Sequence, residues 1–210
     1  MPHLYLVSDE AAAAFRDYVA AGGTLVVTYL SGIAEPDSRI RLGGYPGAFR
    51  EILGVRVIEW HPQVPGTVIT LSAAPASDGA PDAAGLVAGR WIERVETAGA
   101  ETVSLYADGP LAGSPAITRN RYGAGSAWYI STGLTDDSLQ ALLHRVAEES
   151  GIGPVLPGLP SEVEAVRRGD LLFLFNHGDR AATVGDVVLP PGGVRIRSAD
   201  GVEGPPVGRG

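Results

Sequence analysis

The sequence predicts an α/β protein in which a partly parallel sheet carries helices on both faces and a small antiparallel β domain follows. Residues 24–29 read TLVVTY, an apolar and β-branched run without polar alternation. Such a run is typical of a strand covered on both faces, so we expect a central strand there. Apolar residues at helical spacing over 11–19 separate it from an earlier apolar run at 3–7. The order strand, helix, strand predicts a parallel sheet with a right-handed crossover.

The first helix is expected to begin after Ser8 and to end at Gly22, residue types that favour helix starts and stops. A loop at 30–44 follows the central strand, and loops at the carboxyl ends of strands commonly hold ligands or partners in open α/β sheets. The other expected elements, in chain order, are a short helix at 48–53, a strand nearer an edge at 55–60, a run with strand character at 68–71, a surface loop at 72–85, strands at 86–95, 101–106, 115–122 and 126–132, and a helix from Asp136 to Gly151.

A domain boundary is predicted where Pro and Gly gather at 153–160, because this composition is typical of a stiff connector. The first domain then covers 1–152 and a C-terminal antiparallel β domain covers 161–210. Four short strands are expected in the second domain, at 163–168, 171–176, 182–189 and 194–198. The tail at 201–210 is rich in Gly and Pro, and we expect it to be loose.

The composition argues against several classes of protein. A net charge of −8 argues against a nucleic-acid partner, since such proteins carry clustered cations. The chain has no cysteine, which removes disulfides and a cysteine nucleophile and fits a cytoplasmic location. No run approaches the ~20 apolar residues of a membrane span, so no membrane partner is expected. The first residues lack a secretory signal and start directly in a predicted strand, which suggests a piece of a longer protein.

No residue pattern indicates a metal or a cofactor. The histidines lack metal-ligand spacing; they are His3, His61, His144 and His177. Trp60 and His61 lie together at a strand end, where an aromatic face can stack on a sugar ring. The alternative is that this pair only closes the edge of the sheet. Trp91 and Trp128 lie within β segments and are expected in the core.

Four blocks of sequence, in order and at matching spacing, resemble the region downstream of the catalytic barrel in family-42 β-galactosidases. They are SDEAAAAFRDYVAAGGTLVVTYLSGI, LGGYPGAFREILGVRVIEWHP, RNRYGAGSAWYIST and PGLPSEVEAVRRGDLLFLFNHGD. The resemblance implies a trimerisation domain with a fold like class I glutamine amidotransferases, which is flavodoxin-like, and then a small β-sandwich. The family's two catalytic glutamates belong to a barrel of about 250 residues. This chain has no room for that barrel, so no catalytic residue is carried over.

The resemblance also implies a function and two partners. The chain would be a non-catalytic region that assembles and supports a β-galactosidase, an enzyme that removes terminal non-reducing β-D-galactose with retention. Its partners would be its own copies, in a homotrimer, and the catalytic barrel. A threefold arrangement is a closed heterologous contact, in which each copy uses two different surfaces. The predicted interface residues are Arg39, Arg41, Tyr45, Phe49 and Arg50, because interfaces favour arginine and aromatic side chains.

Two alternatives remain open. One is a free-standing amidotransferase-like hydrolase that uses Ser31 or a bound metal. Cysteine is absent, and Ser31 lacks the first glycine of a G-x-S-x-G nucleophile elbow, so both observations disfavour this chemistry. The other is a sugar-binding accessory module that uses Trp60 and His61.

Overall fold

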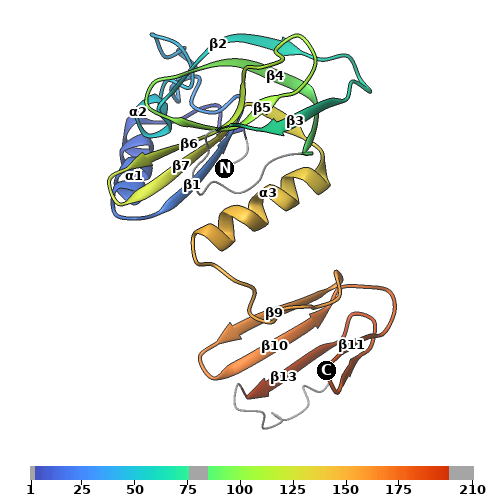
Figure 1. Cartoon of the computed structure of the whole chain (residues 1–210). Helices are drawn as coiled ribbons and strands as arrows, with labels where there is room; N and C mark the ends of the chain where they lie inside the picture. The colour runs from blue at the N-terminus through green and yellow to red at the C-terminus, as the bar shows by residue number, and fades with distance from the viewer. Residues whose placement is uncertain (1–2, 76–84, 199–210) are drawn as a thin grey trace. The chain divides into compact units, whose positions relative to one another are not determined.

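The computed structural model describes residues 3–75 and 85–198. The chain divides into two compact units, Met1–Gly151 and Ile152–Gly210, which are described separately. Figure 1 shows the first unit in blue to yellow and the second in orange to red. No helix among the described residues has the length and apolar character needed to cross a membrane.

The first unit is built on a mixed sheet. Its elements are α1 (Asp9–Ala20), β1 (Thr24–Thr28), α2 (Arg50–Leu53), β2 (Val55–Pro62), β3 (Ile69–Ala73), β4 (Val87–Thr97), β5 (Glu101–Tyr106), β6 (Pro115–Tyr122), β7 (Gly125–Ile130), β8 (Thr132–Leu134) and α3 (Asp136–Glu149). The strand order is β1-β7-β6-β5-β3-β4-β2, and β8 pairs with β4. Among the described strands, only β1 and β7 pair in parallel. The predicted hairpin of β6 and β7 is confirmed, as is the position of β2 at an end of the sheet.

The prediction that β1 is a central strand was wrong. In the described part of the chain β1 lies at an end of the strand order and pairs only with β7. The apolar run at 3–7 forms no strand beside it and makes a single parallel bridge between Leu6 and Ala34. The predicted strand–helix–strand unit is therefore absent there. A continuous apolar run indicates that both faces of a strand are buried, but it does not indicate that the strand pairs with a neighbour on each side.

Two apolar cores cover the two faces of this sheet, and β7 shows how they are divided. Ala127 and Tyr129 point into a core shared with α1 and α2. Trp128 and Ile130 point to the opposite face, into a core that includes Leu142 of α3. Because alternate residues of a strand face opposite sides, both faces are covered by helices, as predicted. Trp128 is buried, which confirms its expected place in the core.

The helix ends follow the local sequence signals. Ser8 caps α1 by accepting a hydrogen bond from the Ala11 N–H. Gly54 ends α2 in the left-handed region, at φ 60°, where a side chain would also meet Asn120. Thr135 caps α3, so the two aspartates predicted to open this helix lie in its first turn.

The second unit is antiparallel, as predicted. Its strands are β9 (Val163–Arg168), β10 (Leu171–Asn176), β11 (Ala182–Val184), β12 (Val187–Leu189) and β13 (Val194–Ser198). They form a three-stranded sheet β13-β10-β9 and a hairpin β11-β12. The single strand expected at 182–189 is divided by a turn at Gly185, where φ is 58°. The predicted loose tail at 201–210, and most of the loop expected at 72–85, lie outside the described residues.

Asn176 organises the turns of this small unit. It is 2% exposed, and its amide donates hydrogen bonds to the carbonyls of Arg180, Leu189 and Pro190. Its side-chain oxygen accepts from the Gly178 N–H. These contacts explain the NHGD sequence at 176–179 as a structural turn.

Candidate functional site

Five aromatic side chains of the first unit form a continuous row, called here the aromatic row: His3, Tyr29, Trp91, Trp60 and Tyr45. Successive ring centroids lie 4.5 Å, 6.1 Å, 5.9 Å and 4.6 Å apart. These distances fall in the range over which aromatic pairs attract. The aromatic row therefore joins segments that are far apart in the sequence.

The β-sheet places these rings next to each other. Trp60 lies on β2 and Trp91 on β4, and the two strands pair in antiparallel fashion, with Pro62 opposite Trp91. Tyr45 reaches Trp60 because its segment bridges to β2, where the Val57 N–H donates to the Tyr45 carbonyl at 2.7 Å. Tyr29 directly follows β1. Trp91 was expected in the core, but it is only partly buried.

Exposed apolar side chains are concentrated in the same stretch of the chain. Leu42 is 89% exposed and Trp60 is 36% exposed. The other large apolar residues exposed between 40 and 68 are Ile40, Ile58, Val64 and Val68. Exposed apolar surface of this kind is typical of an interaction site. We call the aromatic row together with these apolar residues the association surface.

The structure places the five predicted interface residues in different environments. Tyr45 is in the aromatic row. Arg39 is 74% exposed and pairs with Glu35 and Asp37, while Arg41 is largely buried and pairs with Asp9 at 2.7 Å. Arg50 donates to the Gly43 carbonyl and so holds the loop before α2. Phe49 is fully buried and packs edge-to-face on Phe15, so its ring has no surface to offer a partner.

The two residues predicted as a sugar contact have different partners. Trp60 stacks on Tyr45, while the His61 ring lies 3.0 Å from Glu59, which also accepts a hydrogen bond from Arg94. Their contact with a sugar stays a prediction. Tyr29 was missed because it reads as the end of a buried strand. Ile58 and Trp60 are both exposed on β2, but Glu59 between them is exposed too and the pairing with β4 is irregular between Val57 and Glu59, so strand alternation gave no clear signal for this surface.

A buried carboxylate lies beneath the aromatic row. Glu93 of β4 is 1% exposed. Its side chain accepts a hydrogen bond from Trp91 Nε1 at 3.0 Å, one from the Tyr129 hydroxyl and one from the backbone N–H of Leu30. Burial is the main cause that raises the pKa of Glu93 to about 7, and these three donors oppose the shift.

Leu30, which donates to Glu93, and Arg90, which lies beside Tyr29, are held in unusual conformations. Leu30 and Arg90 both have positive φ, 57° and 56°, which is uncommon for residues other than glycine. Arg90 lies where the pairing of β4 with β8 is irregular, between Gly89 and Ile92. Positive φ at such positions stores strain that the surrounding contacts must hold.

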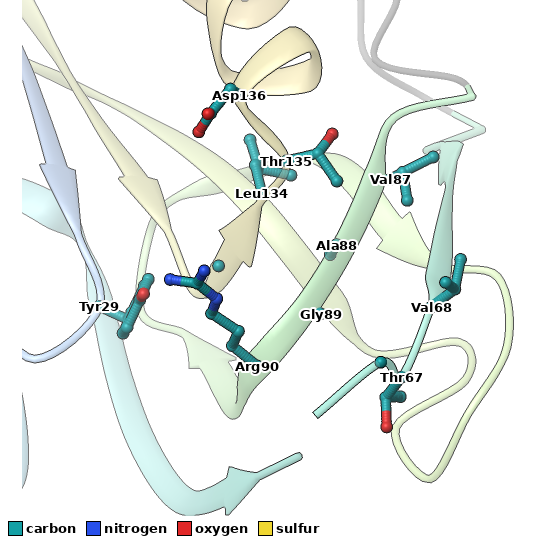
Figure 2. Close-up of a pocket in the computed structure, with 12 residues that line it drawn as sticks. Tyr29, Thr67, Val68, Val87, Ala88, Gly89, Arg90, Leu134, Thr135 and Asp136 are labelled. Carbon is teal, nitrogen blue, oxygen red and sulfur yellow. The ribbon is translucent and has the colours of Figure 1, made fainter. Parts of the chain in front are cut away.

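A pocket of about 370 Å³ adjoins the aromatic row at Tyr29. Figure 2 shows the Arg90 guanidinium beside Tyr29, with Asp136 across the pocket and Val68 among the walls. Gly89 of β4 pairs with Gly133 of β8 here, and a Cβ on Gly133 would lie 3.1 Å from the Gly89 carbonyl oxygen. On the other side, a Cβ on Gly89 would lie 2.6 Å from the Thr67 carbonyl oxygen. The pocket extends the association surface with a concave, charged margin.

Nothing in the described residues supports the hydrolase alternative. Ser31 is fully buried, and its hydroxyl accepts from the Leu4 N–H at 3.2 Å. No group of three or more His, Asp or Glu residues within 3–75 and 85–198 is placed to hold a metal ion.

The first unit is thus a mixed sheet covered by helices on both faces, and the second is a small antiparallel β unit. The family described as the beta-galactosidase trimerisation domain matches residues 1–153, and the chain belongs to this family.

Similar proteins agree with this assignment. A β-galactosidase from Arthrobacter sp is 42% identical over 186 residues, which cover 86% of this chain and 25% of that protein. The β-galactosidase LacZ of Heyndrickxia coagulans is 39% identical, over 87% of this chain and 27% of that protein. The chain thus spans about a quarter of the length of these relatives.

Solved structures extend the likeness over both units. The β-galactosidase of Bacillus circulans sp. alkalophilus matches with a TM-score of 0.81 at 28% identity, over 93% of this chain and 32% of that chain. The enzyme of Rahnella sp. R3 also gives 0.81, at 26% identity, over 93% of this chain and 31% of that chain.

Proposed function

We propose that this chain is the part of a β-galactosidase that assembles the enzyme into a homotrimer, and that its copies meet through the association surface. The single observation that carries the proposal is the exposure of Leu42, Trp60 and other large apolar residues in the segment 40–68, which also contains Tyr45 of the aromatic row. The family description supports self-assembly. Burial of such side chains is favourable by about 1.5–3 kcal/mol for each fully buried Leu or aromatic residue.

A threefold ring needs two different surfaces on each copy. The association surface is proposed as one of them. Arg39 directly precedes Ile40 of this surface in the chain and pairs with Glu35 and Asp37. An exposed arginine beside apolar and aromatic residues is the composition that interfaces favour.

The parent enzyme would remove terminal non-reducing β-D-galactose with retention, and its catalytic carboxylates would lie in the barrel that the family's enzymes possess. The two units of this chain would support that barrel and contribute no group to the reaction. We further propose that the fold of the first unit is like that of class I glutamine amidotransferases. The parallel pairing of β1 with β7 and the helices on both faces support this likeness.

Light scattering on a size-exclusion column, at several concentrations, tests the proposal. A mass three times 21.7 kDa is expected at high concentration. Leu42→Ser should shift the distribution toward the monomer, because it removes the most exposed apolar side chain of the surface. Leu143→Ser, at a 42% exposed leucine of α3, is the matched control and should leave the mass unchanged. A chain of 21.7 kDa at every concentration would contradict the proposal.

A further inference from the structure

The carboxyl group of Glu93 connects the core of the first unit to the association surface. It contacts Trp91 of the aromatic row directly, and it holds the backbone of Leu30, the residue after Tyr29. We propose that the protonation state of Glu93 regulates self-association, so that the copies bind one another more weakly as the pH rises. This inference rests on the proposed function.

The hydrogen bonds explain how a proton on Glu93 reaches the surface. Trp91 Nε1–H can only donate, and Glu93 Oε1 is its acceptor at 3.0 Å. The Tyr129 hydroxyl donates to the other oxygen, so a proton placed there forces a new arrangement of that bond. The hydrogen bonds of the carboxylate thus connect it to Trp91 of the aromatic row, to the backbone of Leu30 and to Tyr129 of β7.

The other ionisable groups that face Glu93 keep their charge state through the neutral range. Burial raises the pKa of Tyr129 well above its usual value and that of Tyr106 to about 12. Burial also raises the pKa of Tyr29, although Arg90 beside it acts in the opposite direction. Among these neighbours Glu93 is the group whose charge changes near neutrality.

Two histidines near the surface provide the competing explanation and must be controlled. The His3 ring packs on Tyr29 at 4.5 Å, and His61 follows Trp60 on β2. Imidazoles change charge in the same range of pH as Glu93. A double variant, His3→Asn with His61→Gln, removes both charges and leaves Glu93 in place.

The direction of the effect follows from linkage. A second copy seated on the association surface would exclude water from Trp91, which contacts the Glu93 carboxylate, and from Trp60, which lies opposite Glu93 on β2. Less water means a greater penalty for the ionised carboxylate, so association favours the protonated form. By reciprocity, the protonated form favours association.

The test is the self-association constant of the full chain, measured by sedimentation equilibrium between about pH 6 and about pH 8.5. We expect association at least tenfold weaker at the higher pH, since one unit of pKa corresponds to a factor of ten. Glu93→Gln keeps an acceptor for Trp91 but cannot ionise, so its association constant should not vary with pH. The histidine double variant should keep the wild-type dependence.

A second variant keeps the inference testable if Glu93→Gln does not fold. Tyr129→Phe removes one donor from the carboxylate, so the midpoint of the pH dependence should move upward. A trimer whose association constant does not change with pH, or a midpoint that Tyr129→Phe leaves in place, would overturn the inference and leave the proposed function standing. A monomer at every pH would overturn the proposed function itself.

Discussion

The first unit buries two charged side chains in the same sheet, and the contrast between them is instructive. Arg119 on β6 is 2% exposed and pairs with Glu101 at 3.0 Å and with Glu149 of α3. Glu93 on β4 is 1% exposed, and the described residues give it neutral donors and no ion pair. A buried side chain that is paired with opposite charges holds the fold together. The charge of a buried carboxyl group that has only neutral donors changes with pH.

Removal of the buried Arg119 should have the largest effect on stability. Arg119→Ala removes the cation that lies 5.5 Å over the Trp128 ring and leaves two half-buried carboxylates facing each other. We expect a loss of about 3–5 kcal/mol in the free energy of unfolding. Urea denaturation followed by tryptophan fluorescence reports on this unit alone, since Trp60, Trp91 and Trp128 all lie in it.

The control for this prediction is Arg39→Ala. Arg39 also contacts two carboxylates, but it is 74% exposed, so its removal should cost less than about 1 kcal/mol. Equal losses in the two variants would show that burial does not distinguish these ion pairs.

Glu93 should make the free energy of unfolding depend on pH. The folded state raises the pKa of Glu93 from 4.5 to about 7, so between these values the folded chain holds a proton that the unfolded chain has lost. Stability from this group is therefore complete below the lower value and decreases as the pH rises through about 7. The total loss is about 3 kcal/mol, at about 1.4 kcal/mol for each unit of pKa.

Urea midpoints of the dilute chain from about pH 5 to about pH 8.5 measure this decrease, and Glu93→Gln should remove it. Glu10, Glu59 and Asp186 do not confuse the result. Hydrogen bonds to these exposed carboxylates lower their pKa values, so the stability that they contribute is lost only at acidic pH. A profile that is flat across the neutral range would contradict the assignment to Glu93.

Asn176 in the second unit is a third case, a side chain that is buried and polar but uncharged. Asn176→Ala would leave the carbonyls of Arg180, Leu189 and Pro190 without their donor. We expect a loss of about 1–3 kcal/mol that does not vary with pH. Hydrogen exchange of the β10 amides measures it, and a pH-dependent loss would show that the turn contains an unrecognised titrating group.

The fold was predicted best where short-range signals decide it. The bounds of β5, β6, β9 and β10 follow from apolar or β-branched runs and turn residues, and the end of α2 follows from Gly54. The place of β1 in the sheet was not predictable in this way. Strand order depends on which edges meet after folding, and the sequence pattern of β1 carries no information about its edges.

The candidate site was predicted only in part for a related reason. Tyr45 and Trp60 were singled out from their residue type and position, and both lie in the aromatic row. Glu93 was not, because a glutamate within a strand reads as an outward polar residue. Its environment comes from Leu30, Trp91 and Tyr129, which only the folded sheet brings together.

Trp91→Phe should have the smallest effect and test the link between Glu93 and the surface. Phenylalanine can still stack between Tyr29 and Trp60, but the donor 3.0 Å from Glu93 is lost. The ionised carboxylate is then less stabilised, so the pH range over which stability falls should move upward, by about one unit or less. Urea midpoints read by circular dichroism give this shift. Trp60→Phe makes the same ring change at the residue that pairs with Glu93 across β2 and β4. It removes no hydrogen bond from the carboxylate, so it should leave the profile in place. Equal shifts in both variants would mean that stacking in the aromatic row, and not the Trp91 hydrogen bond, sets the titration of Glu93.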